Sequence, residues 1–185
     1  MELLEYARHL SAMLINDAQR MRLLRIVGDL FLPDCWIGAG FVRSLVWDSL
    51  HGRDVSPINT DVDVVWFDPT RASAKLDREM EIRLRSLEPS VEWSVSNQSR
   101  MHEHNGDRPY SSIEDAIKHW PDTAGAVAVR LVGREIEIVA PYGLEDLFSL
   151  VAKPTPAFEG EKTSIFWARS REKRWLERWP RLVFP

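Results

Sequence analysis

Two aspartates, Asp61 and Asp63, are the residues whose type and spacing point most directly to chemistry. They alternate with Val62 and Val64, so on an extended strand both carboxylates point to one face and the two valines to the other. Neighbouring carboxylates repel each other, and each favours the protonated form unless a cation lies between them. Mg²⁺ suits such a pair because it takes oxygen ligands and is commonly held by one or two carboxylates beside substrate phosphates. The strand therefore predicts a site for Mg²⁺, with Mn²⁺ as the alternative ion.

A turn of small residues, Gly38-Ala39-Gly40, precedes this strand and opens a helix expected over residues 41–50. The N-terminus of a helix offers unpaired N–H groups and a positive dipole end, which together bind phosphate. Gly40 lets the backbone come close to such a ligand. Arg43 follows on the helix, where it either reaches a phosphate or pairs with Asp48 or surface glutamates. The turn and the aspartates together predict a site for a nucleoside triphosphate (NTP) and its metal.

The elements that position these residues follow from hydrophobic spacing and turn signals. Helices are expected over residues 3–14, 17–31, 41–50, 71–87, 111–120, 144–151 and 163–179, and strands over 35–39, 61–67, 91–96, 126–132 and 135–140. Asp17 is the expected N-cap of the second helix, and Gly133 the turn of a hairpin between the last two strands. This order predicts an α/β (α+β) fold with a mixed sheet flanked by helices.

The turn, with Phe41-Val42-Arg43, and the Asp61-Val62-Asp63 strand resemble the signature of the DNA polymerase β-like nucleotidyltransferase superfamily. The turn region, together with Leu50-His51-Gly52-Arg53, is similar to the head domain of CCA-adding tRNA nucleotidyltransferases. Ser44 stands where those enzymes have aspartate, so the resemblance does not carry their tRNA specificity.

Four further runs resemble a family of small bacterial nucleotidyltransferase-like proteins, long described as a domain of unknown function. They are residues 60–69, 97–102, 126–131 and 140–148. This resemblance covers nearly the whole chain from about residue 20. It implies the nucleotidyltransferase fold and, more generally, transfer of a nucleoside monophosphate from an NTP to an acceptor hydroxyl.

The superfamily signature also contains a later acidic residue flanked by apolar ones. Glu135 and Glu137 share one face of the last expected strand, and Ile136-Glu137-Ile138 matches the pattern. The resemblance therefore implies that Glu137 completes the metal site with Asp61 and Asp63 and can act as a base. The alternative is that both glutamates only line the solvated face of a hairpin.

Two other groups allow two interpretations each. The polar run 97–102, with Asn97, Gln98, Arg100 and His102, either contacts a base or sugar or orders its own loop. The last expected helix carries three tryptophans among five basic residues (Trp167, Trp175 and Trp179 with Arg169, Arg171, Lys173, Arg174 and Arg178). Such a helix either stacks on single-stranded RNA or, as we expect, packs its tryptophans on the protein and leaves its arginines in solvent.

Composition narrows the class of protein. The 185 residues predict one domain, residues 1–185, whose 44% apolar and 28% charged residues are typical of globular proteins. A net charge of -4 argues against general binding to nucleic acid or to a membrane surface. Cys35 is the only cysteine, so an intrachain disulfide is excluded, and we expect the thiol to be buried and inert. The sequence shows neither a signal peptide nor a membrane-spanning run, which predicts a cytoplasmic location.

The functional prediction is therefore a Mg²⁺-dependent nucleotidyltransferase of the EC 2.7.7 type. Asp61, Asp63 and Glu137 are its predicted metal ligands and catalytic residues, and Gly38, Ala39, Gly40 and Arg43 its predicted nucleotide-binding residues. The acceptor can be a small molecule, a protein side chain or an RNA end. Two alternatives keep the same fold: a catalytically silent nucleotide-binding module, or one partner of a toxin–antitoxin pair.

Overall fold

A five-stranded mixed sheet lies at the centre of the computed structural model, which describes residues 2–185 and the side chains from Leu4 onward. Its strands are β1 (Trp36–Gly38), β2 (Val62–Trp66), β3 (Trp93–Asn97), β4 (Ala128–Val132) and β5 (Glu135–Val139). The strand order is β3-β2-β1-β4-β5, in which β2 and β3 are parallel and the other neighbours antiparallel. The predicted mixed sheet is confirmed, as is the β4–β5 hairpin, where Gly133 has a φ of +62°.

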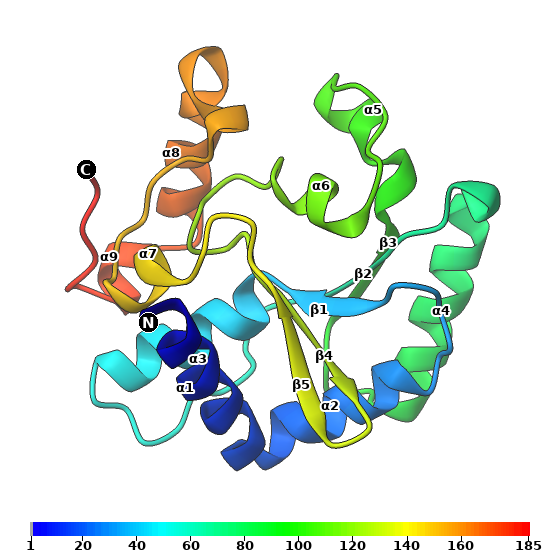
Figure 1. Ribbon diagram of the computed structural model, residues 1–185, viewed down its shortest axis with the longest axis horizontal. Coiled ribbons are helices and arrows are strands. Elements are labelled where there is room, and N and C mark those ends of the chain that lie inside the picture. Colours follow the sequence, from blue (N-terminus) through cyan, green and yellow to red (C-terminus); the bar gives the residue numbers. More distant parts are fainter. Residues whose placement is uncertain (1) are drawn as a thin grey trace.

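The helices flank this sheet (Figure 1). They are α1 (Glu2–Asn16), α2 (Ala18–Gly28), α3 (Gly40–Leu50), α4 (Ala74–Leu87), α5 (His102–Asn105), α6 (Ile113–Ile117), α7 (Glu145–Phe148), α8 (Thr163–Glu172) and α9 (Trp175–Arg178). Asp17 is the N-cap of α2, as predicted, and accepts a hydrogen bond from the Arg20 N–H. The single helix expected over residues 163–179 is wrong, because Arg174 has a φ of +52° and separates α8 from α9.

One face of the sheet is covered by α1 to α4 and carries the main core. Ile37, Val62, Val64 and Val129 point into it and are fully buried. Strand alternation then sends the odd-numbered residues of β2 to the opposite face. Figure 1 shows α1 and α2 below the sheet, and α5, α6 and α8 above it.

The opposite face carries a smaller core under α6. Trp36, Val65 and Ala128 of the sheet pack there against Ile113 and Ile117. This cluster covers only part of the face, so the remaining part is available to the polar side chains that share it.

The last two helices pack against α3 through aromatic side chains. The Trp47 ring meets the rings of Trp175 and Trp179 edge to face, at centroid distances of 5.5 Å and 5.1 Å. Trp179 also donates from Nε1 to Oδ1 of Asp48 at 2.7 Å. The expected packing of Trp175 and Trp179 on the protein is thus confirmed, whereas Trp167 stays partly exposed. Among the described residues, no helix is both long and apolar enough to cross a membrane.

Candidate active site

Asp63 lies near the middle of the sheet, on the face that the main core leaves open. Its strand neighbours at the same level are Gly38 in β1 and Ser94 in β3. Asp61 precedes β2 by one residue, so the alternation places both carboxylates on this face. Burial, reinforced by the charge of Asp61, raises the pKa of Asp63 to about 6. The structure therefore places Asp61 and Asp63 side by side, as the sequence predicted. The charge of Asp61 disfavours ionisation of Asp63, which is the expected repulsion.

The turn before α3 has an unusual backbone. Ala39, the N-cap of α3, has a φ of +52° and a ψ of -120°, a conformation that side-chain-bearing residues rarely adopt. Its N–H donates to the Val127 carbonyl at 3.0 Å, and its side chain provides no cap. The first N–H groups of a helix have no intrahelical acceptor. Ala39 and Gly40 both line pockets that contain Asp63, so this helix end lies beside the carboxylates.

The two glycines of the turn are needed for different reasons. A Cβ on Gly38 would lie 2.5 Å from Cη2 of Trp120, so Gly38 is fixed by close packing of the indole. A Cβ on Gly40 would lie 3.3 Å from Oγ1 of Thr60, a tight contact that the neighbour can relieve by a small shift. Of the predicted nucleotide-binding glycines, Gly40 at the first position of α3 is therefore better placed to offer its backbone to a ligand.

Arg43 is buried, with only 4% of its surface exposed, and its partner is one that the sequence did not suggest. Its Nη1 lies 3.1 Å from Oδ2 of Asp122, and its guanidinium lies 4.3 Å from the ring centre of Trp175. The alternative pairing with Asp48 is wrong, because Asp48 binds Arg53 and Trp179 instead. Burial lowers the pKa of Arg43, which the charge of Asp122 partly offsets.

Asp122 and Gly125 are site residues that sequence reasoning missed. Asp122 accepts a hydrogen bond from the Gly125 N–H at 2.6 Å. A Cβ on Gly125 would come within 2.7 Å of both Arg43 Nη1 and Asp122 Oδ2. The turn-forming run Asp122-Thr-Ala-Gly125 before a strand was the available signal. This turn holds Asp122 against Arg43, so the buried ion pair lies beside Asp63.

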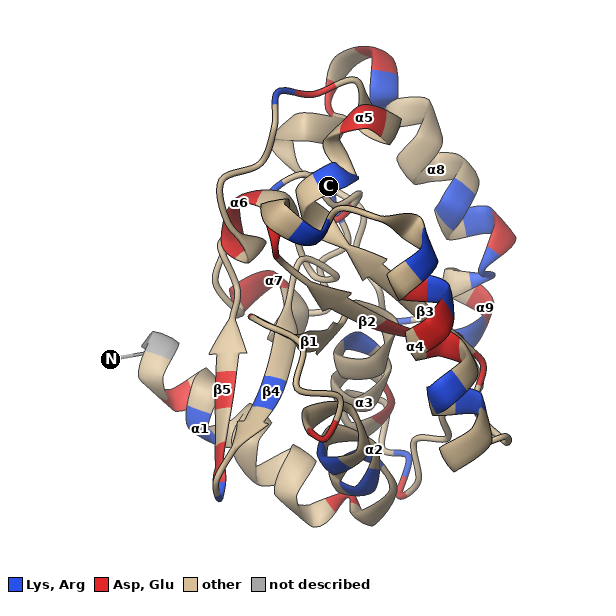
Figure 2. Cartoon of the chain, turned by 90° about the vertical axis from the view of Figure 1, so that its right-hand side faces the viewer, with Lys and Arg blue, Asp and Glu red and all other residues tan. Residues whose placement is uncertain are grey.

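Three cations from the C-terminal segment line a pocket that also contains the carboxylates. Arg169, Lys173 and Arg178 are half-buried and line the same pocket as Asp61 and Asp63. Lys173 Nζ lies 3.4 Å from Asp61 Oδ1. Figure 2 shows the basic bands on α8 and α9. The expectation that the arginines of this segment remain in solvent is therefore wrong for Arg169 and Arg178, and the four-residue spacing of Arg169 and Lys173 was the signal for a shared helix face.

Two adjoining pockets share Arg43, Asp63 and Arg169. The first, of about 170 Å³, is also lined by Ala39, Val65, Ser96, Gln98, Trp120, Pro121, Asp122 and Gly125. The second is also lined by Gly40, Ser44, Thr60, Asp61, Lys173, Trp175 and Arg178. The first is thus partly aromatic and amide-lined, whereas the second is dominated by charges.

Glu137 is not brought to the aspartates. It lies on the edge strand β5, which β1 and β4 separate from β2, and three strand spacings correspond to roughly 14 Å. Its carboxylate instead lies 2.6 Å from the guanidinium of Arg130, which also contacts Asp34 at 3.2 Å. Within the described part of the chain, no three His, Cys, Asp or Glu side chains form a group able to hold a metal ion. The exposed-hairpin alternative describes the contacts of Glu137 better.

Within the run 97–102, most side chains order the loop. Asn97 is fully buried and donates to the carbonyls of Asp68 and Arg71, at 2.8 Å and 3.0 Å. Arg100 pairs with the buried Asp77. Gln98 is different, because it lines the first pocket and donates from Nε2 to Ser96 Oγ at 2.8 Å. The base-reading interpretation therefore has one candidate residue left.

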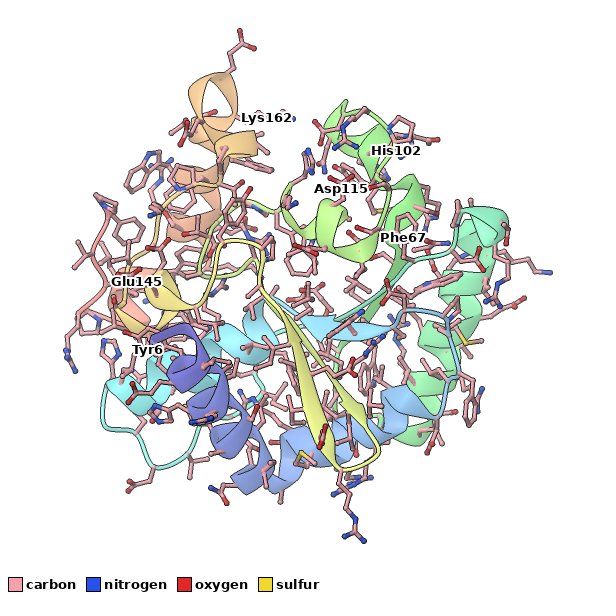
Figure 3. All side chains as sticks on the ribbon, in the orientation of Figure 1. Tyr6, Phe67, His102, Asp115, Glu145 and Lys162 are labelled. Atoms are coloured by element: carbon pink, nitrogen blue, oxygen red, sulfur yellow. The ribbon has the colours of Figure 1, made fainter. Side chains whose placement is uncertain are left out.

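A contact between distant segments links α8 to the region of α5. Lys162, the residue before α8, donates from Nζ to the Asn105 carbonyl at 2.8 Å and lies 3.6 Å from Asp107 Oδ1. Figure 3 labels Lys162 and His102 on these two segments, which stand on the same side of the sheet. The contact ties the segment that carries Arg169 to the side of the sheet that carries Asp63.

The chain was compared with protein families and solved structures. A family model described as "Nucleotidyltransferase" matches residues 25–184. A solved NMR structure, described as revealing a CCA-adding enzyme head domain, is 34% identical, with a TM-score of 0.85, and the match covers 96% of this chain and 95% of that one. A comparison with curated proteins found no match.

Full-length enzymes share the fold at lower identity. The Thermotoga maritima CCA-adding enzyme in complex with tRNA is 16% identical with a TM-score of 0.56, over 94% of this chain and 42% of that one. A CCA-adding enzyme in complex with CTP is 15% identical with a TM-score of 0.53, over 90% and 47%. The chain thus spans less than half the length of these enzymes. The family match and the 34% identical structure together show that the chain belongs to a family of nucleotidyltransferases with the polymerase β-like fold.

Proposed function

We propose that this chain is a Mg²⁺-dependent nucleotidyltransferase that moves a nucleoside monophosphate from an NTP to an acceptor hydroxyl and releases pyrophosphate. The observation that carries the proposal is the position of Asp61 and Asp63 beside the N-terminus of α3. That position combines a carboxylate pair for a cation with a helix end for phosphate. Membership of the nucleotidyltransferase family supports NTP-dependent transfer in general.

The donor set of the site fits Mg²⁺ or Mn²⁺ together with a nucleotide. Asp61 and Asp63 supply carboxylate oxygens on one face, and burial together with the charge of Asp61 raises the pKa of Asp63, so a bound cation would favour the ionised pair. Among the described residues no third carboxylate joins this pair, so substrate phosphates and water would provide the remaining ligands, which is usual for Mg²⁺. When bound, the ion would polarise the phosphoryl oxygens and offset the charge that develops on them.

The protein's own groups position the triphosphate. Ala39 and Gly40, at the start of α3, line the pockets that contain Asp63, so the N-terminus of this helix would bind phosphate there. Arg43 lies one turn further along α3, and its guanidinium is held in place by the hydrogen bond from Nη1 to Asp122 Oδ2. These groups would hold the α-phosphate in line with the acceptor, so that positioning supplies much of the rate.

The reaction is a substitution at the α-phosphorus. The acceptor hydroxyl oxygen forms the new P–O bond, the bond to the β-phosphate bridging oxygen breaks, and pyrophosphate leaves. The hydroxyl proton passes to a base in the site or to water. The nucleoside would occupy the first pocket, where Trp120 offers an aromatic face and Gln98 an amide.

The acceptor stays open among a small molecule, a protein side chain and an RNA end. The related solved structures are described with CTP, ATP and tRNA, so all four NTPs and an RNA 3′ end belong in the first screen. Ser44 stands where the CCA-adding enzymes have an aspartate. This difference argues against tRNA as the default acceptor.

The test distinguishes nucleotidyl from phosphoryl transfer. Purified protein is incubated with Mg²⁺, NTP labelled at the α- or the γ-phosphate, and fractions of small metabolites, RNA and protein. The proposal predicts α-label in a product, γ-label only in pyrophosphate, and loss of both signals in Asp63→Asn. Binding of NTP without α-label transfer to any fraction would favour the silent module, and transfer of γ-label to an acceptor would contradict the proposal.

A further inference from the structure

Two arginines that line the site each have one buried donor atom without a partner. Nε of Arg43 and Nε of Arg169 are inaccessible to solvent and have no hydrogen-bond partner within the described residues. A buried donor without an acceptor is destabilising, so such a group at the wall of a pocket is a candidate contact for a ligand. Both arginines line both pockets around Asp63. A ligand with hydrogen-bond-accepting oxygens in these pockets could therefore bind both of them.

The surrounding charges define the ligand as an anion. The second pocket is lined by four cations (Arg43, Arg169, Lys173 and Arg178) and by two carboxylates. With Asp122, the buried partner of Arg43, included, a local excess of one positive charge remains in a chain whose net charge is -4. A bound Mg²⁺ would raise that excess further. A ligand with several negative charges and many acceptor oxygens would balance it, and Arg pairs such oxygens through its fork of N–H groups.

We propose that α8 and α9 form the triphosphate clamp of this site, with Arg169, Lys173 and Arg178 binding the β- and γ-phosphates opposite the N-terminus of α3. The inference deepens the proposed function and rests on it. The occupant is the triphosphate because the three cations line the same pocket as the two carboxylates that would hold its metal.

Lys173 has two positions in this scheme. Its Nζ lies 3.4 Å from Asp61 Oδ1, where its charge partly offsets that of the carboxylate pair. Binding of metal at Asp61 would take over this function, and the ammonium would then move to the phosphates. Removing the Lys173 charge therefore weakens triphosphate binding without removing a metal ligand.

The α9 segment is anchored firmly enough to serve as one wall of the clamp. Trp175 stacks against the guanidinium of Arg43, and its ring meets that of Trp47. Arg178 donates to Asn59 Oδ1 at 2.9 Å, two residues before Asp61. The clamp is thus built onto α3 and the loop that leads into β2, the two segments that also carry the turn and the aspartates.

The test uses inorganic tripolyphosphate, which carries the phosphates without a nucleoside. Calorimetry would measure its binding in the absence of metal to the wild type, Arg169→Ala, Lys173→Ala and Arg171→Ala. Arg171 is the matched control because it lies on the same helix with its side chain exposed. Thermal melts would confirm that each variant is folded. The proposal predicts about tenfold or greater weakening in the Arg169 and Lys173 variants and no change in the Arg171 variant.

Nucleotides extend the test and separate it from the proposed function. In Mg²⁺, Lys173→Ala should weaken NTP binding by the same factor and leave binding of the nucleoside monophosphate unchanged, because Lys173 lines only the second pocket. Equal tripolyphosphate affinity in all four proteins, or none in the wild type, would overturn the clamp even if NTP binding still required Asp63. Preference for a 5′-phosphorylated oligonucleotide over tripolyphosphate would also overturn it and assign the cations to an RNA end. Conversely, tripolyphosphate binding that depends on Arg169 and Lys173 as predicted, together with NTP binding that is unchanged in Asp63→Asn, would support the clamp and contradict the metal site.

Discussion

Arg43 and Asp122 lie 79 positions apart in the sequence and form a buried ion pair of 3.1 Å beside Asp63. Both side chains are at least 95% buried, so neither charge can recover its hydration when the other is removed. The pair connects α3 to the segment that leads into β4, and Gly125 leaves the space that it occupies. The position of Arg43 in the site therefore depends on a residue outside every motif of the sequence.

This pair predicts a non-additive effect on stability. Arg43→Met and Asp122→Asn should each lower the free energy of unfolding by about 3 kcal/mol, because each leaves an uncompensated buried charge. The double variant should lose clearly less than the sum of the two. Urea denaturation of the four proteins measures the coupling. Additive losses would show that the two side chains do not stabilise each other.

Glycine substitutions test the close packing at the turn. Gly38→Ala should destabilise the protein by about 1–3 kcal/mol, because the new Cβ would lie 2.5 Å from the Trp120 ring. Gly28→Ala is the control, since nothing lies within 4 Å of its added Cβ and its helix gains up to about 1 kcal/mol. Thermal melts compare the two. Equal melting temperatures for both variants would contradict the packing of Trp120 on Gly38.

Asp63 gives the metal-free protein a specific pH dependence. Its folded-state pKa of about 6 lies above the usual 3.8, so the folded state binds this proton more tightly than the unfolded state does. The protein therefore loses stability as the pH rises from about 4 to above 6. Asp63→Asn removes this loss and should raise the free energy of unfolding by about 3 kcal/mol at pH 7.5, with the gain shrinking toward pH 4. Denaturation curves across this range, measured in EDTA, test it; a gain that does not vary with pH would contradict the raised pKa.

Cys35 should be unreactive in the folded protein. The residue is half-buried and not fully buried as expected, but desolvation still raises the pKa of its thiol to about 12, so almost no thiolate is present at pH 8. Reaction with Ellman's reagent should be slow in buffer and fast in urea. Labelling of the native protein as fast as of the unfolded chain would contradict the expected inert thiol.

Local patterns were sufficient for much of this fold. The alternation around Asp61 and Asp63 correctly placed both carboxylates on one face, because strand periodicity depends only on adjacent residues. The mixed sheet and the hairpin at Gly133 followed from the same kind of signal. The helix expected over residues 111–120 is shorter in the structure, where α6 begins at Ile113 and Ser112 caps it by accepting from the Asp115 N–H; element ends depend on geometry that propensities do not fix.

Long-range relationships were beyond these patterns. Lys173 contacts Asp61 from 112 positions away, and no local signal connects the two. The prediction that Glu137 joins the aspartates required β5 to lie near β2, but the strand order puts β1 and β4 between them. Strand order is set by packing of the whole chain, so a motif match in one strand does not say which strand it will face.

The most direct test of the account compares three carboxylates in one binding experiment. Calorimetry would measure Mg²⁺-dependent binding of each NTP to the wild type, Asp61→Asn, Asp63→Asn and Glu137→Gln, with folding checked for each. The account predicts that at least one NTP binds only with metal, that both aspartate variants lose this binding, and that Glu137→Gln retains it. Metal-dependent binding that survives in both aspartate variants, or that is lost in Glu137→Gln alone, would contradict the assignment of the metal to Asp61 and Asp63.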